Sequence, residues 1–127
     1  MGYPDMPLWT PAEAGRVLAS LSASNDLVFF DNWATDVVGH GGGLDASIVI
    51  LQDIDAFLGG LLAAVDLEQT LVAIVSDHGN IEDIRARGHT ENLTPTVLIG
   101  AGQARAADAI SDLTDVMGAL LDVIRHT

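Results

Sequence analysis

The chain has 127 residues, of which 49% are hydrophobic. This fits one packed domain and excludes both a disordered segment and two domains of ordinary size. Its 18 acidic residues face five arginines and no lysine, and the resulting net charge of −13 disfavours nucleic-acid and anionic-membrane partners, which need a basic face. There is no cysteine, so disulfides and thiolate metal sites are excluded.

The first ten residues lack the basic start and apolar block of a signal peptide. No apolar run approaches the roughly 20 residues that a membrane-spanning helix needs. We therefore expect a cytoplasmic protein without a membrane partner.

The first elements expected are a helix and a buried strand. Thr10 and Glu13 form a capping box with Pro11 at the first helical position, so a helix should run to about Ser22. Leu27–Phe30 is a continuous apolar run of strand length, which is typical of a strand covered on both faces in a parallel sheet. The expected buried face of the helix comprises Ala14, Val17, Leu18 and Leu21.

A loop over 31–43 should lead into a long amphipathic helix over 44–66, weakened where Gly59-Gly60 interrupts it. The apolar positions that recur along this helix at steps of three and four are Leu44, Ile48, Leu51, Ile54, Leu58, Leu61 and Val65.

The second half of the chain is expected to add two strands and a helix. Thr70–Val75 reads as a strand, 81–94 as a loop and Thr96–Ile99 as a short strand. A small-residue connection over Gly100–Ser111 then leads into a helix over Leu113–Ile124. The order predicts an α/β fold, with a mostly parallel sheet and helices on both faces. Three strands make a small sheet for so apolar a chain, which suggests that neighbouring strands lie on other polypeptide.

Five metal-ligating side chains follow the predicted strands. Asp36 and His40 come after the first strand, Asp77 and His78 directly after the second, and His89 eleven residues later. In open α/β sheets, functional groups gather past the carboxyl ends of the strands. Imidazole and carboxylate are the usual ligands of zinc and manganese, and five of them suggest two neighbouring ions.

Structural roles are open for each of these residues taken alone. A single histidine near a strand end is more often a hydrogen-bonded structural residue than a ligand. Asp36 could cap a turn, Asp77 could begin a short helix, and Asn80 fits a turn without chemistry. The joint pattern is harder to explain in this way, because the helices carry no histidine except His126, to which no role is assigned.

At these residues the chain resembles the alkaline phosphatase superfamily. The resemblance is strongest to its branch of cofactor-independent phosphoglycerate mutase and phosphopentomutase, and extends over about 26–125. The matching segments are Phe30–His40, Leu51–Gly59, Thr70–Asp83 and His89–Asn92. The segments Gly41-Gly42-Gly43 and Leu93-Thr94-Pro95 depart from those mutases.

The resemblance implies a partial alkaline-phosphatase-like sheet and a two-metal site for phosphoryl transfer on a phosphorylated small-molecule substrate. Asp36, His40 and His89 would hold one divalent ion, Mn or Zn. Asp77 and His78 would help to hold the second.

In the family, the second ion also needs an aspartate near the N-terminus and a serine or threonine nucleophile, and no segment here matches either. Residues 1–127 are therefore expected to be a single domain, the C-terminal metal-binding portion of a metalloenzyme, inactive alone. No catalytic residue is nominated, and an N-terminal partner segment is expected.

Several alternatives stay open. The same ligand set would serve a phosphodiesterase or pyrophosphatase of this superfamily. The chain could instead be a non-catalytic module, stabilised by one metal ion or pairing with a separate N-terminal chain. Arg85 and Arg87 could reach a phosphate, although solvated arginines are the commoner case.

Overall fold

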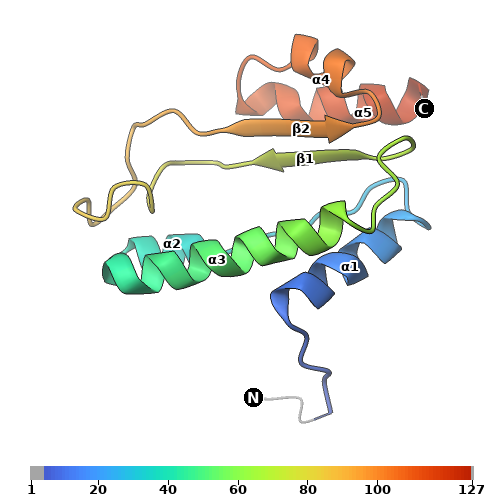
Figure 1. Ribbon diagram of the computed structural model, residues 1–127. Coiled ribbons are helices and arrows are strands. Elements are labelled where there is room, and N and C mark those ends of the chain that lie inside the picture. Colours follow the sequence, from blue (N-terminus) through green and yellow to red (C-terminus); the bar gives the residue numbers. More distant parts are fainter. Residues whose placement is uncertain (1–4, 127) are drawn as a thin grey trace.

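The computed structural model describes residues 5–126. Residues 1–4 and Thr127 lie outside it, and the prediction that the N-terminus is not a signal peptide falls partly on these residues. The elements are the helices α1 (Pro11–Ser22), α2 (Ala34–Gly39) and α3 (Gly43–Leu62), the strands β1 (Leu71–Val75) and β2 (Thr96–Gly100), and the helices α4 (Gln103–Ala109) and α5 (Val116–His126), with a 3-10 turn at Leu113–Asp115 (Figure 1).

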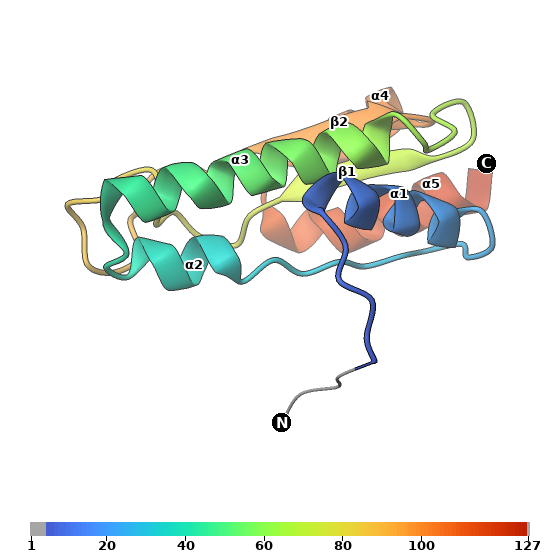
Figure 2. The same ribbon diagram turned by 60° about the horizontal axis from the view of Figure 1, so that its bottom comes forward.

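The two strands carry one helical layer on each face, which confirms the α/β class and the helices on both faces. Side chains alternate along a strand, so each face has its own core. Val72 and Ile99, opposite one another in the register, pack with Ala19 of α1 and Leu61 of α3. On the other face, Leu98 packs against the buried alanines and valine of α4 and α5 (Figures 1 and 2).

The expectation of a mostly parallel sheet is wrong. The described residues form one two-stranded sheet in which β1 and β2 run antiparallel. A loop over 76–95 joins the two strands, whereas a parallel pair needs a crossover, usually a helix.

No strand forms at Leu27–Phe30 in the described chain, and Phe29 is 83% exposed. The segment is extended but has no neighbouring strand. An apolar run becomes a strand only where another strand accepts its backbone hydrogen bonds.

The expected first helix is confirmed in its bounds and its cap. The Thr10 backbone N–H donates to Glu13 Oε2 at 2.8 Å, and the Glu13 N–H donates to the Thr10 hydroxyl at 3.4 Å. Its buried positions are Gly15 and Ala19, however, while Leu21 is exposed.

The backbones of α1 and α3 touch directly where they cross. A Cβ on Gly60 would overlap the carbonyl oxygen of Ala12, and one on Gly15 would overlap that of Phe57. The Gly59-Gly60 pair therefore does not interrupt α3, which continues to Leu62. Gly60 instead allows the close approach of α1.

Other boundaries differ from the expectation. α3 ends four residues early, and a short helix, α2, forms within the expected loop over 31–43. The small-residue connection contains α4, and the last helix begins at Val116 after the 3-10 turn. Short helices of this kind have too few apolar positions for a clear period.

The first half of α3 lies largely open to solvent. Its 20 residues span about 30 Å, whereas five-residue strands span about 17 Å, so the sheet cannot cover the whole helix. We call the large exposed hydrophobic side chains on α2, on α3 and in the segment before them the exposed apolar set: Leu27, Phe29, Phe30, Trp33, Val37, Leu44, Ile48, Val49 and Leu51.

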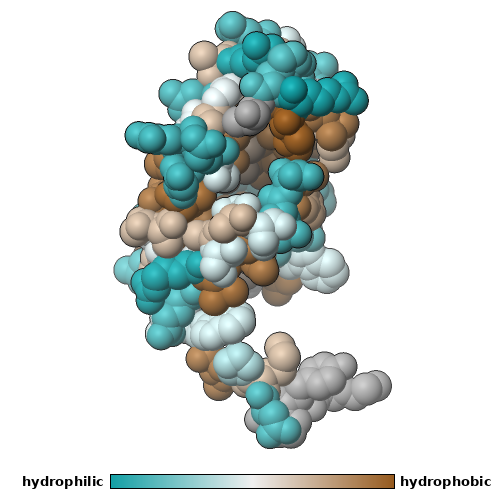
Figure 3. All heavy atoms as spheres, turned by 90° about the vertical axis from the view of Figure 1, so that its right-hand side faces the viewer, coloured by the Kyte–Doolittle hydropathy of each residue, from teal (hydrophilic) through white to brown (hydrophobic). Residues whose placement is uncertain are grey.

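Hydrophobic residues also reach the surface among hydrophilic ones on the face drawn in Figure 3. Among the described residues, no helix combines the length and the apolar character needed to cross a bilayer.

Candidate metal centre

Short local structures bring the predicted ligands to one place. Asp36 lies in the first turn of α2 and His40 caps its C-terminus, so their spacing of four puts both on one helix face. Asp77 and His78 follow β1, and His89 precedes β2 in the connecting loop. The isolated bridge between Gly79 and Thr90 draws the His78 and His89 segments together.

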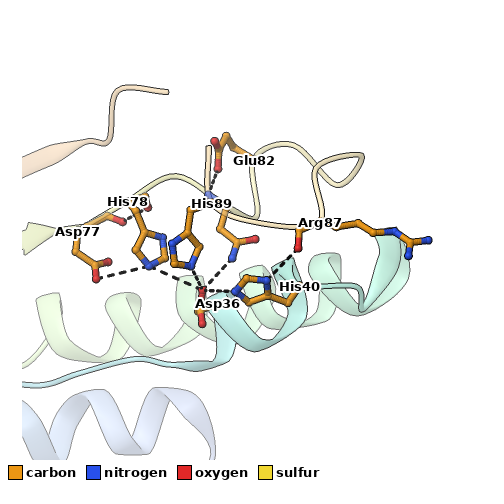
Figure 4. Close-up of polar contacts among 9 residues, drawn as sticks. Asp36, His40, Asp77, His78, Glu82, Arg87 and His89 are labelled. Atoms are coloured by element: carbon orange, nitrogen blue, oxygen red, sulfur yellow. Dashed lines mark hydrogen bonds and ion pairs between the residues drawn. The ribbon is translucent and has the colours of Figure 1, made fainter. Parts of the chain in front are cut away.

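Three imidazoles point at a single carboxylate oxygen, Asp36 Oδ1 (Figure 4). The Nε2 atom of His89 lies 3.2 Å from it, that of His40 3.3 Å and that of His78 3.9 Å. These residues are separated by up to 53 positions in sequence.

The contacts of His40 indicate which of its nitrogens faces Asp36 without a proton. Its Nδ1 lies 3.2 Å from the backbone oxygen of Arg87, which can only accept a hydrogen bond. Nδ1 therefore carries the proton in the neutral ring, and the lone pair of Nε2 faces a carboxylate oxygen. Two acceptors at 3.3 Å repel unless a proton or a cation lies between them.

The dimensions of this cluster fit a metal ion. One ligand atom each from Asp36, His40 and His89 lies within 4.8 Å of the others. Around a tetrahedral ion with bonds near 2.1 Å, neighbouring ligand atoms are about 3.4 Å apart. The distances from Asp36 Oδ1 to His40 and His89 are close to that value. Three ligands would leave a fourth position open, as in catalytic zinc sites.

Asp77 and His78 lie beside this cluster. His78 Nε2 is 3.6 Å from Asp77 Oδ2, and its ring stacks on His89 with centroids 3.4 Å apart. The Nδ1 atom of His78 is buried and has no hydrogen-bond partner among the described residues. Asp77 has a side chain 76% exposed, so its carboxylate is free to turn toward an ion.

The surroundings of Asp36 favour its ionised form. Partial burial acts to raise the pKa of Asp36, but the hydrogen bond from Asn80 and the neighbouring His40 and His89 outweigh it. The pKa of Asp36 is therefore lowered, which suits a metal ligand.

Asn80 contacts Asp36 directly, although the sequence analysis did not place it among the candidate ligands or their supports. Its Nδ2 donates to Asp36 Oδ1 at 2.9 Å, and the residue is only 5% exposed. A Cβ on Gly39 would overlap the Asn80 side-chain oxygen, so Asn80 is seated directly on α2. Its place in the run Asp77-His78-Gly79-Asn80 was the one sequence feature that could have indicated this role, but a simple turn explained the residue equally well.

The two arginines of this loop have different partners. Arg85 forms a paired contact with Asp83, at 2.8 and 2.9 Å. Arg87 offers its backbone oxygen to His40, while its guanidinium points away from the cluster (Figure 4). Neither guanidinium is directed at the candidate metal position.

Comparison with known families yields a match to the Metalloenzyme superfamily over residues 12–126. The chain belongs to the Metalloenzyme superfamily. Several curated proteins to which the chain is similar are named 2,3-bisphosphoglycerate-independent phosphoglycerate mutase. The resemblance to that mutase branch is thereby confirmed.

The mutase of Rhodopseudomonas palustris is 31% identical over 95% of this chain and 26% of its own length. That of Ruegeria is 32% identical over 87% and 24%, and that of Halobacterium salinarum 31% over 95% and 27%. The chain thus spans about a quarter of these relatives. No solved structure matches it.

Proposed function

We propose that this chain is the metal-ion-binding portion of a two-metal phosphoryl-transfer enzyme of the phosphomutase or phosphatase type. The observation that carries the proposal is the convergence of three imidazoles on Asp36 Oδ1 from three separate segments. Membership of the Metalloenzyme superfamily and the names of the relatives support it.

In this proposal, Asp36, His40 and His89 hold one divalent ion, Mn or Zn, and Asp77 with His78 contributes to a second. Two such ions stabilise the attacking and leaving oxygens of a phosphoryl transfer and offset phosphate charge. The chain's own residues set up the ligands. Asn80 orients the Asp36 carboxylate, and the Arg87 backbone oxygen selects the His40 tautomer.

The charge of the chain bears on the proposed substrate, a phosphorylated small molecule. A net charge of −13 would repel such an anion unless cations lie at the site. The proposed ions supply that positive charge, since neither Arg85 nor Arg87 is directed at the cluster.

We further propose that the residues form one domain equivalent to the C-terminal portion of the mutases. The nucleophile and the remaining ligands of the second ion would then come from an N-terminal segment or partner. The chain alone should bind about one ion well and show no mutase or phosphatase turnover. A cytoplasmic location remains a prediction.

Isothermal titration calorimetry with Mn²⁺ and Zn²⁺ tests the proposal. We expect one ion bound per chain, with the binding heat lost in His40→Ala. His126→Ala is the matched control and should leave binding unchanged, because the polar contacts of His126 in the described part of the chain are with Asp122 on α5, outside the cluster. Absence of binding heat in the parent chain, or equal binding by both variants, would contradict the proposal.

The reaction type has an alternative within the superfamily. A phosphodiesterase or pyrophosphatase would use the same ligand set, and the residues around Asp36 favour neither reaction. Turnover assays with a phosphomonoester, a phosphodiester and pyrophosphate, on the complete proposed enzyme, would separate these reactions.

A non-catalytic role is favoured by one observation, the exposed apolar set, which a partner chain could cover. In that role the chain would be an interaction module stabilised by a single ion. Removing the metal would then unfold the domain. In the enzyme role, metal removal should abolish activity but lower the melting temperature only modestly.

A further inference from the structure

The carboxylate of Glu82 lies between the two loop segments that carry His78 and His89. Glu82 Oε2 accepts the backbone N–H of Asn80 at 2.6 Å. Glu82 Oε1 accepts the hydroxyl of Thr90 and, at 2.9 Å, the side-chain amide of Asn92. One side chain therefore bonds to the residue after His89 and to the residue two positions after His78.

The backbone closes the same junction. The Thr90 N–H donates to the Gly79 oxygen at 2.8 Å. A Cβ on Gly79 would overlap both the Thr90 hydroxyl and the Glu82 carboxylate, so the contact leaves no space for a side chain. The segments on either side are held at a fixed separation.

This junction has little apolar packing to hold it. The buried residues of the two cores lie on α1, α3, α4, α5 and β1, and none comes from the loop over 76–95. Polar contacts must therefore set the relative position of His78 and His89, whose rings stack at 3.4 Å. Charge-assisted hydrogen bonds such as those of Glu82 are the strongest contacts of this kind.

We propose that Glu82 is a positioning residue of the metal centre, which holds the His89 segment against the His78 segment so that both imidazoles reach Asp36. The proposal rests on the proposed function, since it assumes that these side chains bind an ion. No hydrogen bond or ion pair links Glu82 itself to His78, His89 or Asp36. Residues that orient metal ligands in this way typically change metal affinity 10–100-fold when replaced.

The pKa of Glu82 agrees with this geometry. Hydrogen bonds from Thr90 and Asn92, with that from the Asn80 backbone, lower the pKa of Glu82 to about 2. Its carboxylate is thus ionised, and able to accept all three bonds, throughout the range in which imidazoles bind metals.

The test compares Glu82→Gln with Asp83→Asn in the full chain. Asp83 is the matched control. Among residues 5–126 its carboxylate bonds only to Arg85, two positions away in the same segment, and its pKa is also lowered to about 2. We expect calorimetry to show Mn²⁺ or Zn²⁺ binding at least tenfold weaker in Glu82→Gln and unchanged within twofold in Asp83→Asn.

A double-mutant cycle with Thr90→Val separates a specific junction from general destabilisation. Thr90→Val removes one donor to Glu82, so it should also weaken binding. In the Glu82→Gln background it should cost less than threefold, because the contact is already lost. Fully multiplicative effects, or equal affinities of Glu82→Gln and the parent, would overturn the proposal.

Hydrogen exchange on the metal-free chain decides the proposal even if no ion binds. The Thr90 amide, bonded to Gly79, should exchange at least tenfold faster in Glu82→Gln, while the Val72 amide in β1 stays protected. An unchanged Thr90 rate would refute the role of Glu82. A parent chain that binds no ion would refute the proposed function instead, and the exchange result would still stand.

Discussion

At the scale of single residues, Asp36 organises the centre. One oxygen of its carboxylate is approached by three imidazole nitrogens and by the Asn80 amide. A carboxylate oxygen has two lone pairs, too few to pair with four neighbouring nitrogens. The excess of nitrogen atoms over available hydrogen bonds is what a cation would resolve, and it is why the cluster differs from an ordinary hydrogen-bonded network.

Glu82 also predicts a pH dependence of stability. Its pKa falls from the ordinary 4.5 to about 2 on folding, so its hydrogen bonds stabilise the fold fully above pH 4.5. That contribution is lost as the pH falls from 4.5 toward 2. In Glu82→Gln, the free energy of unfolding measured in urea should therefore decline less between pH 5 and pH 3 than in the parent.

A substitution at Glu91 provides the control for that slope. Glu91→Gln changes charge close by, but no hydrogen bond links Glu91 to the two segments in the described part of the chain. It should change the decline between pH 5 and pH 3 less than Glu82→Gln does, because it removes no hydrogen bond between the segments. Parallel curves for parent and Glu82→Gln would show that the Glu82 contacts do not persist in solution.

The sequence predicts the candidate ligands better than the residues that support them. Asp36, His40 and His89 could be nominated because their residue types are scarce and their chemistry is specific. Asn80 and Glu82 could not, because amide and carboxylate side chains are common in loops and their roles depend on which segments meet. That meeting involves the Gly79–Thr90 bridge, a backbone contact whose pairing cannot be read from the residue types alone.

At the scale of elements, the crossing of α1 and α3 gives a sharp prediction about two adjacent glycines. Gly60→Ala should destabilise the fold by about 1–3 kcal/mol, because the new Cβ would overlap the Ala12 backbone, which cannot move away cheaply. Gly59→Ala should stabilise it by about 0.5–1 kcal/mol, because a Cβ there meets open space and restricts the unfolded chain.

Chemical denaturation of the two variants measures both changes in the free energy of unfolding. Both substitutions lie on α3, so the comparison is made within one helix. The opposite signs matter more than the sizes, since helix propensity alone favours alanine equally at both positions. Two stabilised variants would mean that α1 does not lie against α3 at Gly60.

Some elements can be predicted from local sequence signals alone, and others cannot. α1, with its capping box, and the two strands β1 and β2 were predictable because each has a local signal of its own. The direction of the strands could have been predicted as well. The loop expected between them carries no helix, which leaves a parallel crossover without its usual connection. The run over 27–30 has strand composition, but pairing depends on a neighbour that composition cannot supply.

At the scale of the whole molecule, the period of α3 predicts which residues face inward but not how far the core extends. Leu58 and Leu61 pack on the sheet, while Leu44, Ile48 and Leu51 on the same periodic stripe stay exposed. The stripe is longer than the two-stranded sheet beneath it. The outer part of the stripe is therefore a surface that another polypeptide could cover in either proposed role.

Two leucines on α3 test this distribution of the core. Leu51 is 48% exposed and Leu61 only 7%, so the same substitution should change the free energy of unfolding far less at Leu51 than at Leu61. Leu51→Gln should change the free energy of unfolding by no more than about 0.5 kcal/mol, as for other surface positions. Leu61→Gln should cost at least about 2 kcal/mol, because it removes core packing and buries an amide.

Dye binding adds the readout for the surface itself. Leu51→Gln should lower the fluorescence of a hydrophobic dye such as ANS on the folded chain, because it removes one member of the exposed apolar set. Leu61→Gln should raise it by loosening the core. If Leu51→Gln instead destabilised the chain as much as Leu61→Gln, Leu51 would already be covered in solution, which requires self-association. Sedimentation velocity on the parent would then reveal the dimer directly.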